Sequence, residues 1–537
     1  MQRIIIGALF AWSICAASVL AQAPTYWQDI RPVFRKHCTV CHSAKNIREP
    51  EVSGGLALDT YEAFRKGSQR AIYLPGKGDA SVLIQVLETK DVKKRMPLDA
   101  KPLDMATIAL IRKWVDAGAA EGKKPDEKTE VVVRKSTKTR KLDVTLTTSA
   151  VVPAGVFGKA GGKLELRMKV GPMTPLTAVA FSPDSKLLAT GSYGQAAIWE
   201  LSTGKAMKVL TNVLGAVNDV RFSPDGKILA VAGGQPSAKG DLRLYSVGDW
   251  KLLATLPGHD DSISYLDFSR DGKLLASASF DKTVRIWNVP QLKLERILPD
   301  HSDFVYGVAF SPDAKLLASC SKDRTVKLVE TATGKGVFTF GGMEQDIIAL
   351  AFSRNGKQLV SSGYETSLYW WNTQTGDRIR AQGGHGVAVN ELRFSNDGSK
   401  LVSAGGDSTL RVWNGTTGAL VKTVSVGAHV YAAAISPNNK LLASGSYDGL
   451  ARVWDEASGR LLLTMTSFPG DGEMINWVSL TPEGYGAASS PKLGERGQWL
   501  MAGQQVAADR VWAGLQQPDM VARALRGEKL PPPKFAK

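Results

Sequence analysis

Cysteine is scarce in this chain of 537 residues, which holds only four. Four thiols are too few for a fold built on disulfide bonds. Beyond the first two dozen residues, no apolar run reaches the length of a membrane span. Hydrophobic residues make up 43% and charged residues 22% of the chain, values that exclude a disordered protein and a multi-spanning membrane protein. Given its length, we expect a globular protein of two or more domains.

Negative charge is in deficit. Lys and Arg total 67 against 51 Asp and Glu, which gives a formal net charge of +16 at pH 7. A strongly basic chain suits nucleic acid, an acidic protein or an anionic surface. Because the N-terminal segment predicts export, we expect an acidic protein partner or an anionic surface, and no nucleic acid.

Residues 1–23 have the pattern of a secretory signal peptide. Arg3 supplies the positive start, and an apolar stretch follows over residues 4–20. The Ala-Gln-Ala sequence that ends at Ala23 has the small-x-small form that signal peptidase cleaves. We therefore expect cleavage near Ala23 and a periplasmic or otherwise exported protein whose mature chain has no membrane span. An uncleaved anchor helix is the alternative.

The sharpest chemical signal is Cys38-Thr39-Val40-Cys41-His42. The C-x-x-C-H spacing is that of covalent haem attachment, in which both thiols add to haem vinyl groups and the adjacent His binds the iron. A redox-active cysteine pair needs a βαβ context, and a zinc site needs further Cys or His, of which residues 43–258 contain none. We expect one haem c, attached through Cys38 and Cys41, with His42 as the proximal iron ligand.

The second axial ligand has three candidates in residues 24–120. Met96 lies in an Arg-Met-Pro loop that the proline stiffens. Met105 falls on a helix predicted over residues 104–117, in step with three core positions, Ile108, Ile111 and Val115. His37 adjoins the attachment site and cannot readily reach the opposite haem face. We predict Met96 as the distal ligand, and a Met/His pair raises the reduction potential.

Residues 26–119 resemble the planctomycete-type cytochrome c domain. Besides Cys38 to His42, the matching segments are Gly54 to Thr60, Leu74-Pro75-Gly76, Ser81 to Ile84, Met96-Pro97 and Trp114 to Ala119. Leu98 stands where the family usually has a second proline. The resemblance implies a compact helical haem domain, which we place at residues 24–120, and it gives Met96 the distal role.

A second pattern, F-S-P-D-G-K-L-L-A-S, recurs at intervals of about forty residues. The units start at Phe181, Phe222, Phe268, Phe310, Phe352, Phe394 and Ile435. Nineteen positions after the start, four units have tryptophan: Trp287, Trp371, Trp413 and Trp454. This pattern resembles WD repeats, each of which forms a propeller blade. We therefore predict a multidomain chain, with a small all-α cytochrome c domain followed by an all-β WD-repeat propeller.

The number of blades depends on the ends of the repeat region. The Leu-Thr-Pro-Glu-Gly sequence that begins at Leu480 is a faded unit start, and Trp499 follows it by nineteen positions. A strand at residues 164–170 would complete this eighth blade, formed mainly by residues 475–503. We favour eight blades, with seven plus a C-terminal extension as the alternative. The boundaries are then a basic linker at 121–163, the propeller at 164–503, and a tail at 504–537 with a short helix at 517–526.

Most polar residues of the repeats are expected to be structural. His259, His301 and His385 each precede a unit start by nine residues, where WD repeats hold a histidine that bonds to the turn Asp and the strand Ser. His429 precedes its unit start by only six, so its role stays open. Cys320 takes a slot held elsewhere by Ala, Ser or Gly, which favours a buried small residue over a redox thiol.

The residue four positions before each unit start indicates a binding face. In a propeller, a residue at this position tends to lie toward the channel and the top face. This position is held by Thr177, Asn218, Ser264, Tyr306, Ile348, Asn390 and Tyr431. Tyr306 and Tyr431 are the interaction candidates. Ordinary channel lining is the alternative.

The leading functional hypothesis is an exported electron carrier. The haem domain would exchange one electron with an unidentified redox protein, and the propeller would dock that partner. We assign no catalytic residue. The first alternative is an oxidoreductase of cytochrome cd type, whose propeller needs central histidines for a catalytic haem. The second is a haem-based sensor or scaffold, which a missing Met96 bond would favour.

Overall fold

The structure is a computed structural model, and the chain divides into two compact units, residues 1–139 and 140–537. It describes residues 23–31, 33–34, 58, 61–66, 72–89, 91, 96, 103–122, 144–152, 156, 161–168, 173–211, 213–299, 301–469, 475–490, 493, 498–501 and 503–535. The expected signal sequence, the Cys38 to His42 motif and the basic stretch at 123–143 lie outside the described residues.

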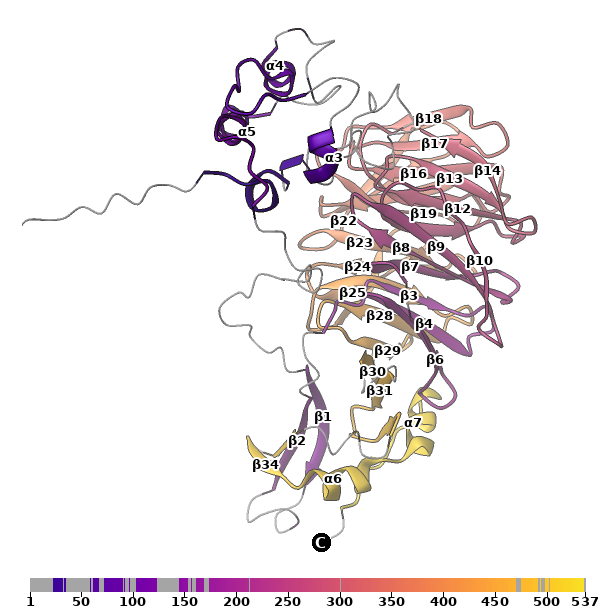
Figure 1. The fold of residues 1–537 in the computed structure, drawn as a ribbon. Helices are drawn as coiled ribbons and strands as arrows, with labels where there is room; N and C mark the ends of the chain where they lie inside the picture. The colour runs from indigo at the N-terminus through magenta and orange to yellow at the C-terminus, as the bar shows by residue number, and fades with distance from the viewer. Residues whose placement is uncertain are drawn as a thin grey trace, which may run out of the picture. The chain divides into compact units, whose positions relative to one another are not determined.

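The regular elements described in the first unit are all helical (Figure 1). They are η1 (Tyr26–Ile30), α3 (Tyr61–Lys66), α4 (Val82–Glu88) and α5 (Met105–Asp116). Their core is aromatic: the Phe64 ring centroid lies 4.8 Å from that of Trp114 and 4.4 Å from that of Tyr73. Large rings on short helices thus give this small unit a packed interior.

Helix α5 begins directly after Asp104, which caps it. The Asp104 carboxylate accepts a hydrogen bond from the Thr107 backbone N–H at 2.8 Å. The helix predicted over residues 104–117 is confirmed to within one residue at each end, and its three predicted core positions are buried. The core position predicted for Met105 is wrong, because its side chain is 75% exposed. Met105 is the first helical residue, and at this end of the helix Leu103, not Met105, is buried in the core.

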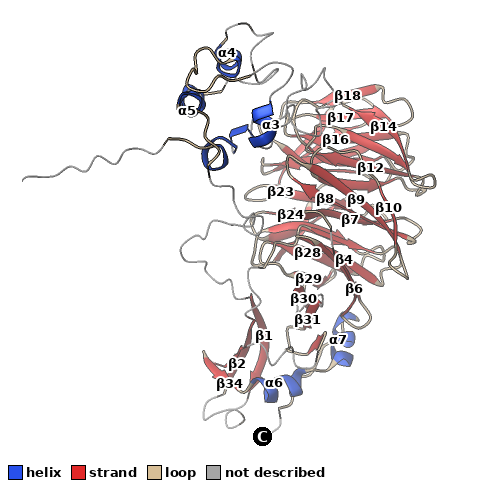
Figure 2. Cartoon of the chain, viewed as in Figure 1, coloured by secondary structure: helices blue, strands red, loops and turns tan. Residues whose placement is uncertain are grey.

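The described strands of the second unit form eight antiparallel sheets (Figure 2). The first three repeat sheets are β3 (Ala178–Phe181), β4 (Leu187–Ser192), β5 (Gln195–Glu200) and β6 (Lys205–Leu210); β7 (Ala216–Phe222), β8 (Ile228–Gln235), β9 (Lys239–Ser246) and β10 (Leu252–Thr255); and β11 (Ile263–Phe268), β12 (Leu274–Ser279), β13 (Val284–Asn288) and β14 (Lys293–Leu298). The next three are β15 (Val305–Phe310), β16 (Leu316–Ser321), β17 (Val326–Glu330) and β18 (Gly336–Phe340); β19 (Ile347–Phe352), β20 (Gln358–Gly363), β21 (Ser367–Asn372) and β22 (Arg378–Gly383); and β23 (Val389–Phe394), β24 (Lys400–Gly405), β25 (Thr409–Asn414) and β26 (Leu420–Ser425).

The seventh repeat sheet is larger than the others. It contains β27 (Val430–Ile435), β28 (Leu441–Ser446), β29 (Ala451–Asp455), β30 (Leu461–Pro469), β31 (Ile475–Leu480) and β32 (Gly486–Ala488). The eighth sheet pairs two distant parts of the sequence, β1 (Val144–Val152) and β2 (Gly162–Met168) with β33 (Gln498–Met501) and β34 (Gln504–Val506).

The first strand of each repeat sheet is its innermost strand. These strands follow one another side by side in the order β3, β7, β11, β15, β19, β23 and β27, and β27 lies next to β3. Each ends at a unit start such as Phe222, where a tight turn follows. In that turn, Ser223 Oγ accepts a hydrogen bond from the Ile228 N–H at 2.9 Å, and Asp225 Oδ1 accepts one from the Lys227 N–H at 3.1 Å. The repeated Ser-x-Asp pattern therefore encodes the turn, and the predicted all-β propeller is confirmed.

The predicted eighth unit is divided between two sheets. Strand β31 pairs with the second half of β30, from Thr464↔Leu480 to Pro469↔Ile475. Strand β33 pairs instead with β2, so Trp499 lies opposite Leu166. Pairing between residues 164–170 and the strand that holds Trp499 is thus confirmed, but one sheet built from residues 475–503 is wrong. The reason is the length of β30, whose outer half continues past β29 and offers β31 an unpaired edge.

Strand β1 lies in the segment expected to be a linker. It pairs with β2, from Val144↔Met168 to Val152↔Gly162. Leu146, Ala150 and Val152 are buried at alternate positions, which is the pattern of a half-buried strand. The linker expectation therefore does not hold for residues 144–152.

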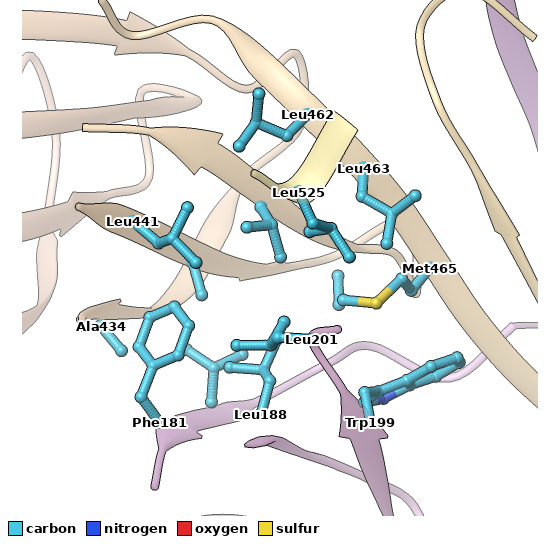
Figure 3. Packing of buried hydrophobic residues seen from close by; sticks show 14 of the residues in the cluster. Phe181, Leu188, Trp199, Leu201, Ala434, Leu441, Leu462, Leu463, Met465 and Leu525 are labelled. Atoms are coloured by element: carbon cyan, nitrogen blue, oxygen red, sulfur yellow. The ribbon is translucent and has the colours of Figure 1, made fainter. Parts of the chain in front are cut away.

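Two short helices, α6 (Ala508–Leu515) and α7 (Pro518–Leu525), follow the last strand. The second is the helix predicted at residues 517–526, and α6 was not predicted. Leu525 of α7 lies beside Leu462 and Leu463 of β30 (Figure 3). The same buried cluster includes Trp199 and other residues of the first repeat sheet. Helix α7 therefore packs at the seam where the first and seventh repeat sheets meet.

Truncating Leu525 to Ala is expected to lower the free energy of unfolding of the propeller by about 2–4 kcal/mol, because the change leaves a cavity in a buried cluster. Urea unfolding followed by tryptophan fluorescence measures the loss. Lys529→Ala, at an exposed position, is the control and should change stability by less than about 0.5 kcal/mol. Equal effects of the two substitutions on the free energy of unfolding would contradict the packing of α7 between the first and seventh repeat sheets.

Candidate functional site

Of the residues predicted to hold haem, the structure describes Met96. Cys38, Cys41 and His42 lie outside the described residues. Met96 is partly buried and packs against the aromatic core of the first unit. Its backbone N–H donates to the Val86 carbonyl at 2.8 Å, which ties this loop position to α4. A thioether is thus held against an apolar core.

The three repeat-phased histidines make the predicted structural contacts. His259 Nδ1 lies 2.7 Å from Asp281 Oδ2, and its Nε2 lies 2.7 Å from Ser277 Oγ. Trp287 Nε1 donates to the same hydroxyl at 2.9 Å. The same network joins His385 to Asp407, Ser403 and Trp413, and His301 to Asp323 and Ser319. Burial lowers the pKa of His259 and of His385, so both rings are neutral structural groups at pH 7.

Four of the seven residues predicted to line a binding face join neighbouring blades instead. Asn218 Nδ2 donates to the Ile263 carbonyl at 2.8 Å, and Asn390 Nδ2 donates to the Val430 carbonyl at 2.7 Å. The same type of bond runs from Ser264 to Val305 and from Thr177 to Val217. Each one links an inner strand to the next, so these side chains satisfy carbonyl groups where the inner strands begin.

Tyr306 and Tyr431 belong to a group of aromatic side chains that we call the aromatic rim. Its members are Phe280, Phe304, Tyr306, Tyr364, Tyr431 and Tyr447. The Phe280 ring centroid lies 5.1 Å from that of Phe304 and 5.8 Å from that of Tyr306. Burial raises the pKa of Tyr431, and the neighbouring Tyr447 and Tyr364 raise it further. Tyr364 and Tyr447 are 56% and 57% exposed, so the rim presents aromatic surface to solvent.

The sequence reasoning missed four rim residues, and three of them share one position in the repeat. Phe280, Tyr364 and Tyr447 each stand twelve positions after a unit start, directly before the acidic residue of the next turn. Counting from the unit start, which located the histidines, would also have identified this position. His429 also lies at the rim, with its ring 4.7 Å from that of Tyr431 and its Nε2 2.9 Å from Asn390 Nδ2.

A second group, which we call the channel network, spans the ring between the two ends of the inner strands. Its members are Asp219, Arg221, Tyr265, Asp267, Glu391 and Arg393. Arg221 Nη2 lies 3.2 Å from Glu391 Oε1, and Arg393 Nε lies 2.7 Å from the same oxygen. The guanidinium carbons of Arg221 and Arg393 lie 5.0 and 4.7 Å from the centroid of the Tyr265 ring. Two cations therefore share one aromatic ring and one carboxylate.

The network depends on small residues elsewhere in the ring. Its members occupy the positions one and three before the unit start in the second, third and sixth repeats. The other four repeats hold Ala or Gly there: Ala178 and Ala180, Gly307 and Ala309, Ala349 and Ala351, Ala432 and Ala434. Because these side chains are short, they leave space in the channel for the long side chains of the network to reach across it. The signal in the sequence was charge at inner-strand positions that are otherwise alanine, and the sequence reasoning missed it.

The acids of the network also accept hydrogen bonds from neighbouring strands. Asp219 Oδ2 accepts from the Leu266 N–H, and Asp267 Oδ2 accepts from the Phe310 N–H, both at 2.8 Å. Burial raises the pKa of Asp267 to about 7, although the Phe310 N–H and Arg221 oppose the shift. Burial also raises the pKa of Glu391 to about 8 and that of Asp219 to about 6, but both of these acids pair with arginine. Of the three acids, Asp267 alone has no ion pair within the described residues.

Within the part of the chain that the structure describes, no group of three or more His, Cys, Asp or Glu could hold a metal ion. In the same residues, no helix is long and apolar enough to cross a membrane. Cys320 is buried, and burial raises the pKa of its thiol. The prediction of a buried small residue at this position is confirmed.

Two family models match the chain. The model for the WD domain, G-beta repeat, matches half of the chain, in seven segments at residues 166–200, 205–246, 250–288, 292–330, 334–372, 376–414 and 418–455. The model for the planctomycete cytochrome C domain matches residues 38–99. The two matches fall on the two parts that the sequence predicted.

Similar curated proteins match over short segments. The chain is 36% identical over 116 residues to U3 small nucleolar RNA-associated protein 12 of Saccharomyces cerevisiae, which covers 21% of this chain and 12% of that protein. It is 32% identical over 106 residues to WD repeat and SOCS box-containing protein 1 of Homo sapiens, covering 19% and 24%. It is 41% identical over 68 residues to the human intraflagellar transport protein 122 homolog, covering 13% and 5%. The chain thus spans less than a quarter of the length of these relatives.

Replacing His385 by Ala is expected to lower the free energy of unfolding by about 2–3 kcal/mol, because Ser403 and Asp407 lose a buried partner. Urea unfolding measures the change. His429→Ala removes a partly exposed histidine from the same propeller and should cost less than about 1 kcal/mol. Similar losses for the two variants would contradict the structural role of the buried network.

Replacing Asp267 by Asn is expected to remove a pH dependence of stability. The folded pKa of Asp267, about 7, lies above its unfolded value, about 4. The folded state therefore holds the extra proton between these values, and the stability that this group contributes falls as the pH rises through that window. Because Asn keeps a carbonyl oxygen for the Phe310 N–H, the variant should gain on the order of 1–3 kcal/mol relative to the wild type from about pH 4 to pH 7.

The measurement is urea unfolding at a series of pH values. Asp377→Asn, at an exposed turn, serves as the matched control and should follow the wild-type curve. A difference between Asp267→Asn and the wild type that stays constant with pH would show that Asp267 is ionised throughout.

Proposed function

Because the chain belongs to the WD40 repeat family and carries a planctomycete cytochrome C domain, we propose that it is an exported c-type cytochrome that transfers single electrons. In this proposal, the mature chain acts in the periplasm after cleavage near Ala23, and the propeller docks a partner protein. The observation that carries the proposal is Cys38-Thr39-Val40-Cys41-His42, which opens the matched segment 38–99. This spacing is the one that covalent haem attachment requires.

One haem c fits the donor set. Cys38 and Cys41 would hold it covalently, and His42 and Met96 would bind the iron. The partly buried position of Met96 against the helical core supports its role, because an apolar surrounding limits the access of water to an axial ligand. When bound, the haem supplies a one-electron couple whose potential a Met/His pair raises. The chain's own residues attach, orient and shield it.

The propeller is a protein-interaction platform, and we place its docking face at the aromatic rim. Exposed tyrosines such as Tyr364 and Tyr447 bury a large area on binding, and Tyr is enriched at protein interfaces. Tyr306 and Tyr431 stand beside them as the candidates first chosen from the sequence. The net charge of +16 and the basic run at residues 121–143 favour an acidic redox protein as the partner.

We also propose that the ring has seven blades rather than eight. Support comes from the contact of β27 with β3 and from the seven matched repeats. The sheet of β1, β2, β33 and β34, with α6 packed on β33, is then an accessory layer outside the ring.

The channel network argues against an oxidoreductase of cytochrome cd type. Arg221, Tyr265 and Glu391 occupy the centre of the channel, where such an enzyme holds its catalytic haem. Three of the four propeller histidines are engaged inside their blades. A haem-based sensor differs from an electron carrier in its iron ligation, so a test of Met96 separates the two.

The test uses the full chain exported from a host that attaches c-type haem. We expect one covalent low-spin haem per chain. Met96→Ala should abolish the absorption band of sulfur-bound iron and lower the reduction potential, because the thioether ligand is lost. Met105→Ala, which changes an exposed methionine of the same unit, should leave the spectrum and the potential unchanged.

Three results would overturn the proposal. Protein without covalent haem would contradict the whole account. Two haems per chain would reassign the protein to an oxidoreductase. High-spin iron that binds small gases in the wild type would reassign it to a sensor.

A further inference from the structure

A cavity of about 600 Å³ opens at the end of the channel opposite the aromatic rim. Rim residues such as Tyr306 lie where inner strands begin, whereas the cavity is lined by unit starts such as Phe310, where inner strands end. Asp267 and Arg393 of the channel network also line the cavity. Its volume is that of a small-molecule site. We call it the mouth cavity.

Two arginines line the mouth cavity at a position where four of the seven repeats hold proline. The third residue of the unit is proline in four repeats, at Pro183, Pro224, Pro312 and Pro437. It is Arg270 in the third repeat and Arg354 in the fifth, and both line the cavity. Burial lowers the pKa of Arg354, and the charge of Arg270 lowers it further, so the two cations lie near each other. Within the described residues, neither guanidinium has a hydrogen-bond or ion-pair partner.

Arg393 contributes a third guanidinium with spare donors. Its Nε donates to Glu391, whereas its Nη2 is buried and has no hydrogen-bond partner. A buried donor without a partner costs free energy, which an oxygen of a ligand would recover.

The charge of the mouth cavity is positive. Among its lining residues, three arginines stand against Asp267, whose pKa burial raises to about 7. The turn beside Arg354 also lacks an acid: Asn355 stands where four other repeats have an aspartate that faces the turn lysine, as Asp313 faces Lys315 at 3.9 Å. The fifth repeat therefore adds an arginine and loses a carboxylate at the same place.

We propose that the mouth cavity binds a small organic anion. Its carboxylate or phosphate group would contact Arg270, Arg354 and Arg393, and its apolar body would rest against the phenylalanines of the unit starts. Guanidinium groups suit both anions, because their paired N–H donors match two oxygens. The site belongs to the propeller alone and does not rest on the proposed electron transfer.

The experiment is calorimetric titration of the full chain with phenyl phosphate and with benzoate at low ionic strength. Two control ligands separate the parts of these molecules: inorganic phosphate has the anionic group without a ring, and phenol has the ring without an anionic group. The variants are Arg270→Pro and Arg354→Pro, which introduce the residue that four other repeats carry at this turn and should therefore fold. Each is expected to weaken binding by about tenfold. Lys335→Ala removes one exposed charge outside the cavity and should leave the affinity unchanged.

Comparing the affinities of phenyl phosphate and benzoate shows whether the site prefers a phosphate or a carboxylate group. The proposal is supported if one or both bind more tightly than inorganic phosphate and phenol do. Equal affinities for the wild type and both proline variants, with unchanged circular dichroism and melting, would overturn it. Binding of an acidic peptide with no binding of either aromatic anion would also overturn it and would reassign the mouth cavity to a protein partner.

Discussion

The contact between Arg221 and Glu391 is the constraint on which the centre of the propeller depends. It joins the inner strand of the second repeat sheet to that of the sixth, across the channel. Removing Arg221 would take a buried cation away from both Asp219 and Glu391, which costs more than the intact contacts contribute. The long side chains can cross only because the other repeats hold Ala or Gly at the same positions, as Ala349 and Ala351 do. This contact thus explains why the other repeats hold Ala or Gly at two positions of the inner strand, one and three residues before the unit start.

The two ends of the inner strands differ because the repeat constrains them differently. Where the strands end, the Ser-x-Asp turn requires the serine hydroxyl and the acceptor side chain of its third residue. The residue between them varies from repeat to repeat, as Pro183, Arg270 and Asn396 show. Where the strands begin, Asn218 and Asn390 bond to the next strand, and the repeats without such a bond hold larger side chains such as Tyr306. The side chains that distinguish one repeat from another therefore lie at positions where the fold does not require a particular residue.

What the sequence could predict follows the same division. The turn pattern, the histidine networks and the helix behind Asp104 were predictable, because each depends on contacts within a few residues or within one repeat. The channel network was not, because Arg221 and Glu391 stand 170 positions apart and meet only when the ring closes. The exposure of Met105 depends on the burial of Leu103 at that end of the core, and the course of β31 depends on where a strand edge lies unpaired. Those are tertiary facts that periodicity does not contain. The haem ligands other than Met96 lie outside the described residues, so their placement stays a prediction.

The filled channel keeps the two ends of the propeller apart. Aromatic rim residues lie where inner strands begin, mouth cavity residues where they end, and the channel network between them. A protein on the rim and an anion in the mouth would therefore occupy the same strands without sharing a contact residue. Arg393 is in the wall of the cavity and also bonds to Glu391, which pairs with Arg221. An anion in the mouth cavity would therefore contact a member of the channel network directly, whereas a protein on the rim would not.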